Sequence, residues 1–296
     1  MLKSNRALIP GGGGQLGLEL QRTAPPGWDV YAPNSHQLDV SSGPEVERAV
    51  DAYEPTVIIN AAAFTAVDLA ESRPAAAFAV NSEGPANLAL AAKSNGIRLI
   101  HVSTDFVFDG NHDRPYSPAD TPHPLNVYGH SKLQGELRSM ELGPPDTAIV
   151  RTAWVHSSKG KNFVLTILRL LSEGRELRVV ADQVGSPTWA HSLARILWEC
   201  ADRRDVGGVL HWTDRGVATW YDFAVAAQEE AAKQGLLKTI KKIEAIRTED
   251  YPTAAARPRY SALDSTATVK ALGVTQIDWR ESLASMVTEL ARRNND

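Results

Sequence analysis

The sequence predicts an α/β protein with a doubly wound parallel sheet of the Rossmann type and a smaller C-terminal lobe. Short apolar runs alternate with helical patterns through the first half of the chain. These runs are apolar throughout, which is typical of parallel strands covered by helices on both faces. A run of four glycines follows the first of them and precedes the first helical segment, as in dinucleotide-binding folds.

The elements expected in the first half follow from this alternation. A helix is predicted at 14–23, and a second is predicted to begin at Ser42, because Ser42 and Glu45 have the spacing of a capping box. An alanine-rich helical stretch follows the third strand and is interrupted near Gly84 and Pro85. The strands are expected at 6–10, 28–32, 56–60, 98–103 and 148–153.

The second half is less regular. Two loops rich in proline and polar residues, 109–126 and 248–262, are long enough to line a site. Helices are expected at 162–172, 191–202, 220–233 and 279–293, with short β-like runs at 177–180, 209–212 and 243–246.

Composition excludes several classes of protein. With 296 residues, 43% hydrophobic and 22% charged, the chain has ordinary globular usage and is not disordered. A net charge of −4 gives no basic surface for nucleic acid or an anionic membrane. The single cysteine, Cys200, excludes an internal disulfide and any multi-cysteine metal site. No apolar stretch approaches the roughly 20 residues of a membrane span, so a soluble, cytoplasmic protein is expected.

The glycine run, Gly11–Gly14 followed by Gln15, Leu16 and Gly17, is a candidate cofactor loop. Glycines allow a tight turn and a close approach to a diphosphate, whose charge then lies at a helix N-terminus. Four consecutive glycines match many patterns, and a flexible turn is the alternative. The position between a strand and a helix favours the cofactor loop.

The end of the second strand bears on the choice of dinucleotide. An acidic residue there binds the adenine ribose hydroxyls and repels a 2′-phosphate, but the residues at 33–36 are Pro, Asn, Ser and His. Asp39 comes later and suits the adenine edge, with a solvated loop carboxylate as the alternative. This pattern favours NADPH, with NADH possible as a second cofactor.

A second constellation suits proton transfer. Thr104 follows a strand end, where open α/β sheets place ligands. Tyr128 and Lys132 are four residues apart, which places them on one face of a helix. A nearby ammonium is expected to lower the pKa of the phenol toward neutrality. Alone, such a pair is usually a surface pair; beside a glycine loop and a strand-end hydroxyl it indicates catalysis.

On these residues the chain resembles the extended short-chain dehydrogenase/reductases, and within them the dTDP-4-dehydrorhamnose reductase family. The resemblance covers nearly the whole chain and runs through segments 14–17, 39–40, 60–68, 103–110, 124–129, 151–154, 162–163, 182–188, 220–223 and 257–258. It implies an NAD(P)-binding Rossmann domain at 1–153, completed by about 177–214. It also implies a substrate-binding lobe formed by about 154–176 and 215–296.

The resemblance further implies reduction of the 4-keto group of a nucleotide-linked deoxysugar, most simply dTDP-4-dehydro-β-L-rhamnose to dTDP-L-rhamnose, by NADPH or NADH. Tyr128 would donate the proton, Lys132 would hold the nicotinamide ribose and tune Tyr128, and Thr104 would contact the sugar. The implied cofactor contacts are Gly11, Gly14, Gln15, Leu16, Gly17, Asp39, Val40, Ala61, Ala62, Ala63 and Thr65, with Tyr128 and Lys132. The implied substrate contacts are Thr104, Asp105, Phe106, Trp154, Asn162 and Arg257; for Trp154 a place in the core is the alternative.

Some positions depart from the family pattern. Phe106 stands where many members have tyrosine, and Pro10 where related reductases often have threonine. The segment 187–191 lacks the glutamate that follows this motif in members that dimerise through a metal ion, so neither Mg²⁺-linked dimerisation nor a metal site is expected. A monomer or homodimer is expected, without nucleic-acid or membrane partners. A reductase acting on a different keto substrate and a non-catalytic cofactor-binding subunit are the alternatives.

Overall fold

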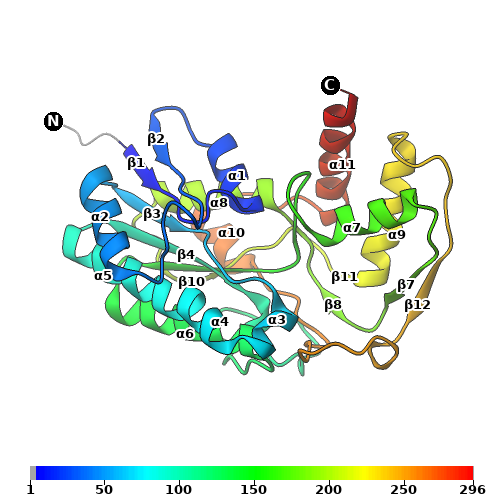
Figure 1. Ribbon diagram of the computed structural model, residues 1–296, viewed down its shortest axis with the longest axis horizontal. Coiled ribbons are helices and arrows are strands. Elements are labelled where there is room, and N and C mark those ends of the chain that lie inside the picture. The colour runs from blue at the N-terminus through cyan, green and yellow to red at the C-terminus, as the bar shows by residue number, and fades with distance from the viewer. Residues whose placement is uncertain (1–4, 296) are drawn as a thin grey trace.

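The computed structural model describes residues 5–295 and confirms the predicted fold class (Figure 1). Its centre is a six-stranded sheet in the order β10-β5-β4-β3-β1-β2, in which every neighbouring pair is parallel. The strands are β1 (Asn5–Leu8), β2 (Trp28–Tyr31), β3 (Val57–Asn60), β4 (Arg98–Thr104), β5 (Ala148–Thr152) and β10 (Gly208–His211).

Helices cover both faces of this sheet, so its central strands β3, β4 and β5 are buried along nearly their whole length. On one face, α1 (Gln15–Arg22), α8 (Ala190–Asp202) and α10 (Thr266–Leu272) share an apolar cluster with the strands. On the other face, α2 (Gly43–Tyr53) and α5 (Gly84–Asn95) form a second cluster. The helix α6 (Val127–Leu142) packs beside α5.

The strand order changes direction between β1 and β3. The chain leaves β1 toward β2 on one side and continues through β3, β4 and β5 on the other. Ligands of open α/β sheets bind at such a point, outside the carboxyl ends of the strands. The glycine turn follows β1, and the segment 61–65 follows β3, so both lie at this edge.

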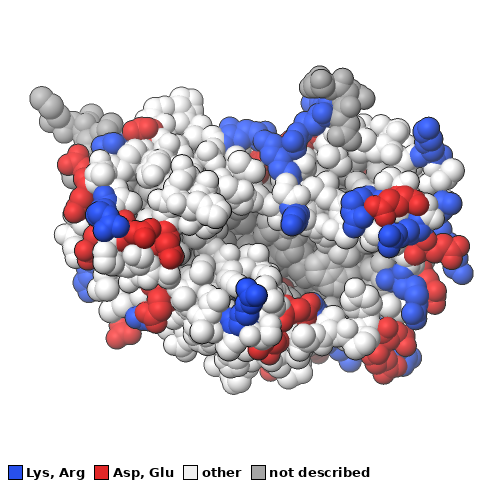
Figure 2. Space-filling view, viewed as in Figure 1, with Lys and Arg blue, Asp and Glu red and all other residues white. Residues whose placement is uncertain are grey.

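A separate apolar cluster holds the smaller lobe together. It joins α7 (Phe163–Ser172), α9 (Trp220–Lys233) and α11 (Trp279–Asn295) with the parallel pair β7 (Leu177–Val180) and β12 (Ile243–Ile246). Two short pairs complete the region: β6 (Val155–His156) with β9 (Thr188–Trp189), and β8 (Val184–Gly185) with β11 (Ala218–Thr219). The space-filling view shows a hollow between this lobe and the sheet (Figure 2).

Residues 177–180 lie elsewhere than expected. The sequence placed the return to the Rossmann domain at about 177, but this strand pairs with β12 in the lobe. The chain returns with α8, which packs against α1, and with β10, which extends the central sheet. A four-residue apolar run suits either sheet, so its partner could not be inferred from its own residues.

Two local expectations also differ. Ser42 is the N-cap of α2, but its side chain makes no capping hydrogen bond; Glu45 instead accepts from the Asp39 N–H at 3.0 Å. The alanine-rich stretch is not broken at Gly84. It runs through α3 (Val67–Ser72), α4 (Pro74–Phe78) and a π-helical turn (Ala79–Glu83) directly into α5.

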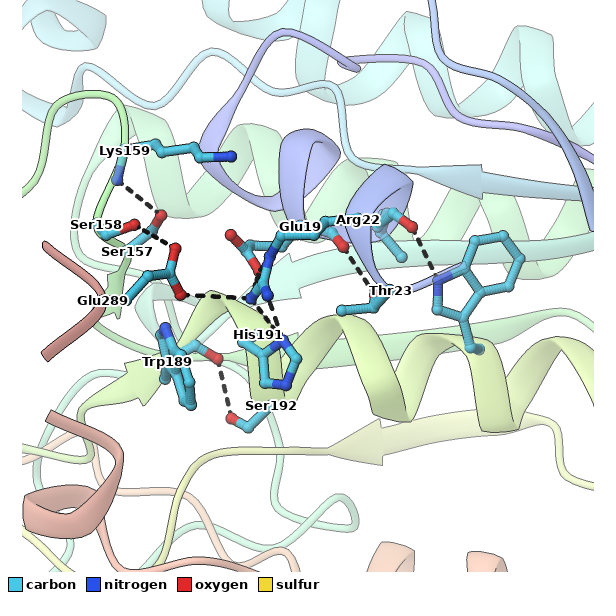
Figure 3. Close-up of polar contacts among 12 residues, drawn as sticks. Glu19, Arg22, Thr23, Ser157, Ser158, Lys159, Trp189, His191, Ser192 and Glu289 are labelled. Atoms are coloured by element: carbon cyan, nitrogen blue, oxygen red, sulfur yellow. Dashed lines mark hydrogen bonds and ion pairs between the residues drawn. The ribbon is translucent and has the colours of Figure 1, made fainter. Parts of the chain in front are cut away.

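A polar cluster connects the two halves of the molecule (Figure 3). Arg22 of α1 bonds Glu19, lies 2.8 Å from the Nδ1 of His191 on α8, and is 3.5 Å from Glu289 on α11. Burial alone would raise the pKa of Glu19, but hydrogen bonds to His191 and Arg22 hold it below its usual value. Ser158 donates to the other oxygen of Glu289 at 2.7 Å. The cluster therefore joins α11 of the smaller lobe to α1, which packs on the central sheet.

Within residues 5–295, no group of three or more His, Cys, Asp and Glu side chains is arranged to hold a metal ion. None of the helices in that range combines the length and apolar character that crossing a bilayer requires.

Candidate active site

The glycine turn after β1 is packed so closely that side chains do not fit. Gly11 has φ +85°, and a Cβ there would lie 2.6 Å from the Ala62 nitrogen. A Cβ on Gly12 would lie 2.0 Å from the Ala32 carbonyl oxygen, and one on Gly17 would lie 2.3 Å from the Gly11 oxygen. The Pro10 carbonyl oxygen accepts the Ala61 N–H at 3.1 Å, which holds the turn against the segment that follows β3.

The turn leads directly into the N-terminus of α1. Gly14 is the N-cap, and no side chain in the described chain caps this helix. The N–H groups of the first turn therefore remain available to an anion, and the helix dipole favours negative charge there. These features fit the diphosphate of a dinucleotide, which needs close backbone approach and N–H donors rather than side chains.

The other expected cofactor residues border the same edge. The Asp39 carboxylate accepts from the N–H and hydroxyl of Ser41 at 2.9 and 2.7 Å, so it also stabilises its own turn. Val40 is buried against α5 through Gly84. The segment from Ala61 to Ala63 is half-buried and Thr65 is exposed.

Thr104 and Asp105 lie at the carboxyl end of β4, and both are buried. The Thr104 hydroxyl donates to one oxygen of Asp105 at 3.1 Å and accepts the Phe106 N–H at 3.2 Å. The second oxygen, Oδ2, has no hydrogen-bond partner among residues 5–295. Burial raises the pKa of Asp105 to about 6. A buried carboxyl with a free oxygen is well suited to bind a polar group of a ligand.

The N-terminus of α6 brings Tyr128 to these residues. Asn126 caps the helix by accepting the Gly129 N–H at 2.7 Å. A Cβ on Gly129 would lie 2.2 Å from the Phe106 carbonyl oxygen, so glycine there allows the helix to pack directly on the turn that follows β4. The Tyr128 ring then meets Phe106 edge-to-face, with centroids 5.8 Å apart.

The protonation of Tyr128 differs from the expectation. Burial raises the pKa of Tyr128 to about 12, although the neighbouring Thr104 hydroxyl opposes the rise. Lys132, expected to lower this pKa, points elsewhere: its Nζ donates to the Val102 carbonyl oxygen at 2.7 Å. Burial lowers the pKa of Lys132 to about 8. In this structure the phenol is protonated at neutral pH, the state that a proton donor needs.

A buried ion pair joins the same helix, one turn beyond Lys132, to the strand β5. Glu136 accepts from Arg151 of β5 at 2.7 Å, and both side chains are nearly inaccessible to solvent. The Ser103 hydroxyl donates to Glu136 at 2.5 Å. Since Ser103 precedes Thr104, this hydrogen bond joins the helix that carries Tyr128 to the strand that carries Thr104, while the ion pair joins the same helix to β5.

A pocket of about 350 Å³ opens beside Phe106. Trp154 lines it with φ +49°, an unusual backbone conformation for a residue with a side chain. Its indole stacks on Trp220 with centroids 3.5 Å apart. Residues from the loop 248–262, which the sequence selected as a site loop, also line it: Tyr251, Thr253, Arg257, Pro258 and Ser261.

Of the six expected substrate residues, Phe106, Trp154 and Arg257 line this pocket, and Thr104, Asp105 and Asn162 do not. Asn162 caps α7, and its amide donates to the Gln15 side chain and the Ser157 carbonyl, both at 2.8 Å. It therefore lies beside the glycine turn. Arg257 lines the pocket and pairs with Asp68 of α3 at 2.7 Å.

Several residues in and around this site were not singled out from the sequence. Trp220 and Phe163 form the aromatic wall with Trp154, and Arg178 and Gln183 line the lobe side of the pocket. Trp220 lies in a segment that carried the family resemblance, which was a usable signal. His101 is buried, and its Nε2 lies 3.4 Å from the Lys132 Nζ.

Comparison with known proteins agrees with this geometry. Residues 5–292 match the family model described as RmlD substrate binding domain. The dTDP-4-dehydrorhamnose reductase of Aggregatibacter actinomycetemcomitans is 41% identical over 95% of this chain and 98% of its own. The chain belongs to the dTDP-4-dehydrorhamnose reductase family. The family's enzyme from Escherichia coli K12 is 40% identical, over 96% of this chain and 97% of its own.

A solved structure of this family supports the same assignment. The dTDP-4-dehydrorhamnose reductase of Bacillus anthracis, solved in complex with NADP, has a TM-score of 0.91 and 34% identity. The match covers 97% of this chain and 99% of that one.

Proposed function

We propose that this protein is an NADPH-dependent oxidoreductase that reduces the 4-keto group of dTDP-4-dehydro-β-L-rhamnose to give dTDP-L-rhamnose. The observation that carries the proposal is the proximity of Thr104 and Tyr128 at the same edge of the sheet as the side-chain-free glycine turn, beside Phe106, which lines the aromatic pocket. The relatives named for this reaction, matched over nearly their whole length, support the choice of substrate.

NADPH, when bound, supplies the hydride for the carbonyl carbon. The chain's own residues then neutralise the negative charge that develops on the carbonyl oxygen. Tyr128, protonated at neutral pH, donates a proton to that oxygen as charge develops. The Thr104 hydroxyl lies beside the phenol and helps to orient it. Asp105, with one free buried oxygen, accepts a hydrogen bond from a sugar hydroxyl.

The remaining assignments form part of the proposal. The glycine turn, the first turn of α1, Asp39–Val40 and 61–65 hold the dinucleotide, and Lys132 binds the nicotinamide ribose. Trp154, Phe106 and Arg257 contact the nucleotide sugar, and Asn162 acts through Gln15. The lobe built from α7, α9 and α11 is the substrate-binding domain. A cytoplasmic location and a monomer or homodimer are proposed as well.

The proposal is tested by following the loss of nicotinamide absorbance with a panel of keto substrates. The panel contains dTDP-4-dehydro-β-L-rhamnose, other 4-keto nucleotide sugars and 4-keto sugars without a nucleotide. We expect the first to have the highest kcat/KM. A higher value for another member would assign a different substrate, and no oxidation with any member would leave a non-catalytic cofactor-binding protein.

Cofactor preference is a second measurable outcome. Because no carboxylate follows β2 at 33–36, nothing at that position repels a 2′-phosphate, and we expect NADPH to be used at least as well as NADH. The measurement is kcat/KM for each cofactor at saturating substrate. A tenfold preference for NADH, about 1.4 kcal/mol, would contradict the assignment of this loop.

Trp154→Ala tests the pocket. Because Trp154 lines the pocket and stacks on Trp220, its loss should raise KM for the nucleotide sugar and leave the Kd for NADPH nearly unchanged. Trp28→Ala, which removes an indole packed on Trp198 away from the pocket, is the control and should leave this KM unchanged. An unchanged KM with a marked loss of thermal stability would make Trp154 a core residue.

A further inference from the structure

The buried histidine of β4, His101, has no role in the function proposed above. Its side chain is fully buried in the middle of the strand whose carboxyl end carries Thr104. Two polar groups face its two ring nitrogens. The Asn60 amide nitrogen, from β3, lies 3.0 Å from Nδ1, and the Lys132 Nζ, from α6, lies 3.4 Å from Nε2.

The orientation of Asn60 determines which nitrogen of His101 carries the proton. The Asn60 Oδ1 accepts the Ala62 N–H at 3.1 Å, so the amide cannot rotate without placing its NH₂ group against that donor. The NH₂ group therefore faces His101 and donates to Nδ1. A neutral imidazole has one donor and one acceptor nitrogen. Its hydrogen is consequently on Nε2, which faces Lys132.

This arrangement determines how His101 acts on Lys132. An ammonium group has three donors and no lone pair, so a charged Lys132 meets the partial positive charge of the Nε2–H. A neutral amine can accept that hydrogen while it donates to the Val102 carbonyl. We propose that His101, oriented by Asn60, is a positioning residue that holds Lys132 and favours its neutral form. The importance of this for turnover rests on the proposed function, but the arrangement itself does not.

The other charged groups around the pair act in opposite directions. Burial and Lys132 hold the pKa of His101 well below its usual range, so the ring stays neutral at physiological pH. The residue that faces His101 from α6 is Lys132, which can carry a charge. The residue that faces His101 from β3 is Asn60, which is uncharged. Glu136, one turn beyond Lys132, favours the ammonium form and opposes His101.

The tautomer can be observed directly in the cofactor-free protein. Long-range ¹H–¹⁵N correlation spectra of ¹⁵N-histidine-labelled protein distinguish a protonated from an unprotonated ring nitrogen, and His101→Phe assigns the signals. We expect hydrogen on Nε2 and a bare Nδ1 from pH 6 to pH 9. Hydrogen on Nδ1, or a doubly protonated ring within that range, would overturn the proposal. If His101→Phe does not fold, His101→Gln serves for the assignment.

The effect on Lys132 is measured by its titration. In protein labelled with ¹³C at lysine Cε, and with Lys132→Met for assignment, the pKa of Lys132 should rise by roughly 0.5 unit or more in His101→Phe. His101→Gln, which retains an N–H donor, should restore the wild-type value. His156→Phe, a matched loss of another buried imidazole, should leave it unchanged. A fall or no change in His101→Phe would overturn the proposal.

These measurements separate two kinds of failure. If the tautomer and the shift are found but no keto sugar is reduced, the proposed function fails and the arrangement of His101 stands. If the sugar is reduced while Lys132 titrates identically in wild type and His101→Phe, the inference alone fails.

Discussion

Replacing Tyr128 with phenylalanine is expected to lower kcat for the keto sugar by at least about 100-fold, because loss of a general acid costs roughly 10²–10⁴ in rate. The variant keeps the ring that packs on Phe106 and removes only the phenol. Folding and the Kd for NADPH should therefore be close to wild type. The measurement is single-turnover reduction, which isolates the chemical step.

Two further variants make this result specific. Tyr251→Phe removes a different phenol, one that lines the pocket beside Phe106, and should keep kcat within a few-fold of wild type. Lys132→Met should lower turnover and also weaken NADPH binding, because the same amine is proposed to hold the ribose. If Tyr128→Phe retains more than a tenth of the wild-type single-turnover rate, the proton comes from another group.

Arg151→Met is expected to lower the free energy of unfolding by about 3–5 kcal/mol, the usual cost of leaving a buried charge without its partner. Glu136 is 3% exposed, and Arg151 provides three of the hydrogen bonds to its carboxylate. Denaturant unfolding measures the change. Because the pair joins α6 to β5, kcat should also fall as Tyr128 loses its position.

The double variant Glu136→Met/Arg151→Met should be destabilised less than the sum of the two single variants, since neither charge is then left alone. Arg169→Met is the matched surface control. Its partner Glu173 and Arg169 itself are well exposed, so this variant should change the free energy of unfolding by less than about 1 kcal/mol. An additive double variant would mean that the two buried side chains contribute independently.

Features set by neighbouring residues were predictable from the sequence. The glycine turn was predicted because a strand, a glycine run and the start of a helix follow one another within 17 residues. Tyr128 and Lys132 were predicted to share one face of a helix because they are one turn apart. The capping box at Ser42 shows the limit of such patterns. Glu45 has the right spacing, but its carboxylate accepts a hydrogen bond from the N–H of Asp39 instead.

Features set by distant residues were not predictable in this way. The Asn162 amide donates a hydrogen bond to the Gln15 side chain, which is 147 residues away in the sequence. No local pattern indicates that partner. The direction of Lys132 depends on Val102 and His101 across the strand–helix interface, which removed the expected effect on the pKa of Tyr128. The strand at 177–180 likewise needed β12 to show which sheet it joins.

The central claim is that hydride reaches C4 of a dTDP-linked keto sugar while Tyr128 protonates its oxygen. The most direct test uses NADPH carrying deuterium at the transferred position of the nicotinamide, with dTDP-4-dehydro-β-L-rhamnose as substrate, and examines the product by NMR. The account predicts dTDP-L-rhamnose with deuterium at C4 in wild-type product and almost no product from Tyr128→Phe in the same time. Unlabelled C4, deuterium at another carbon or no conversion by the wild-type protein would contradict it.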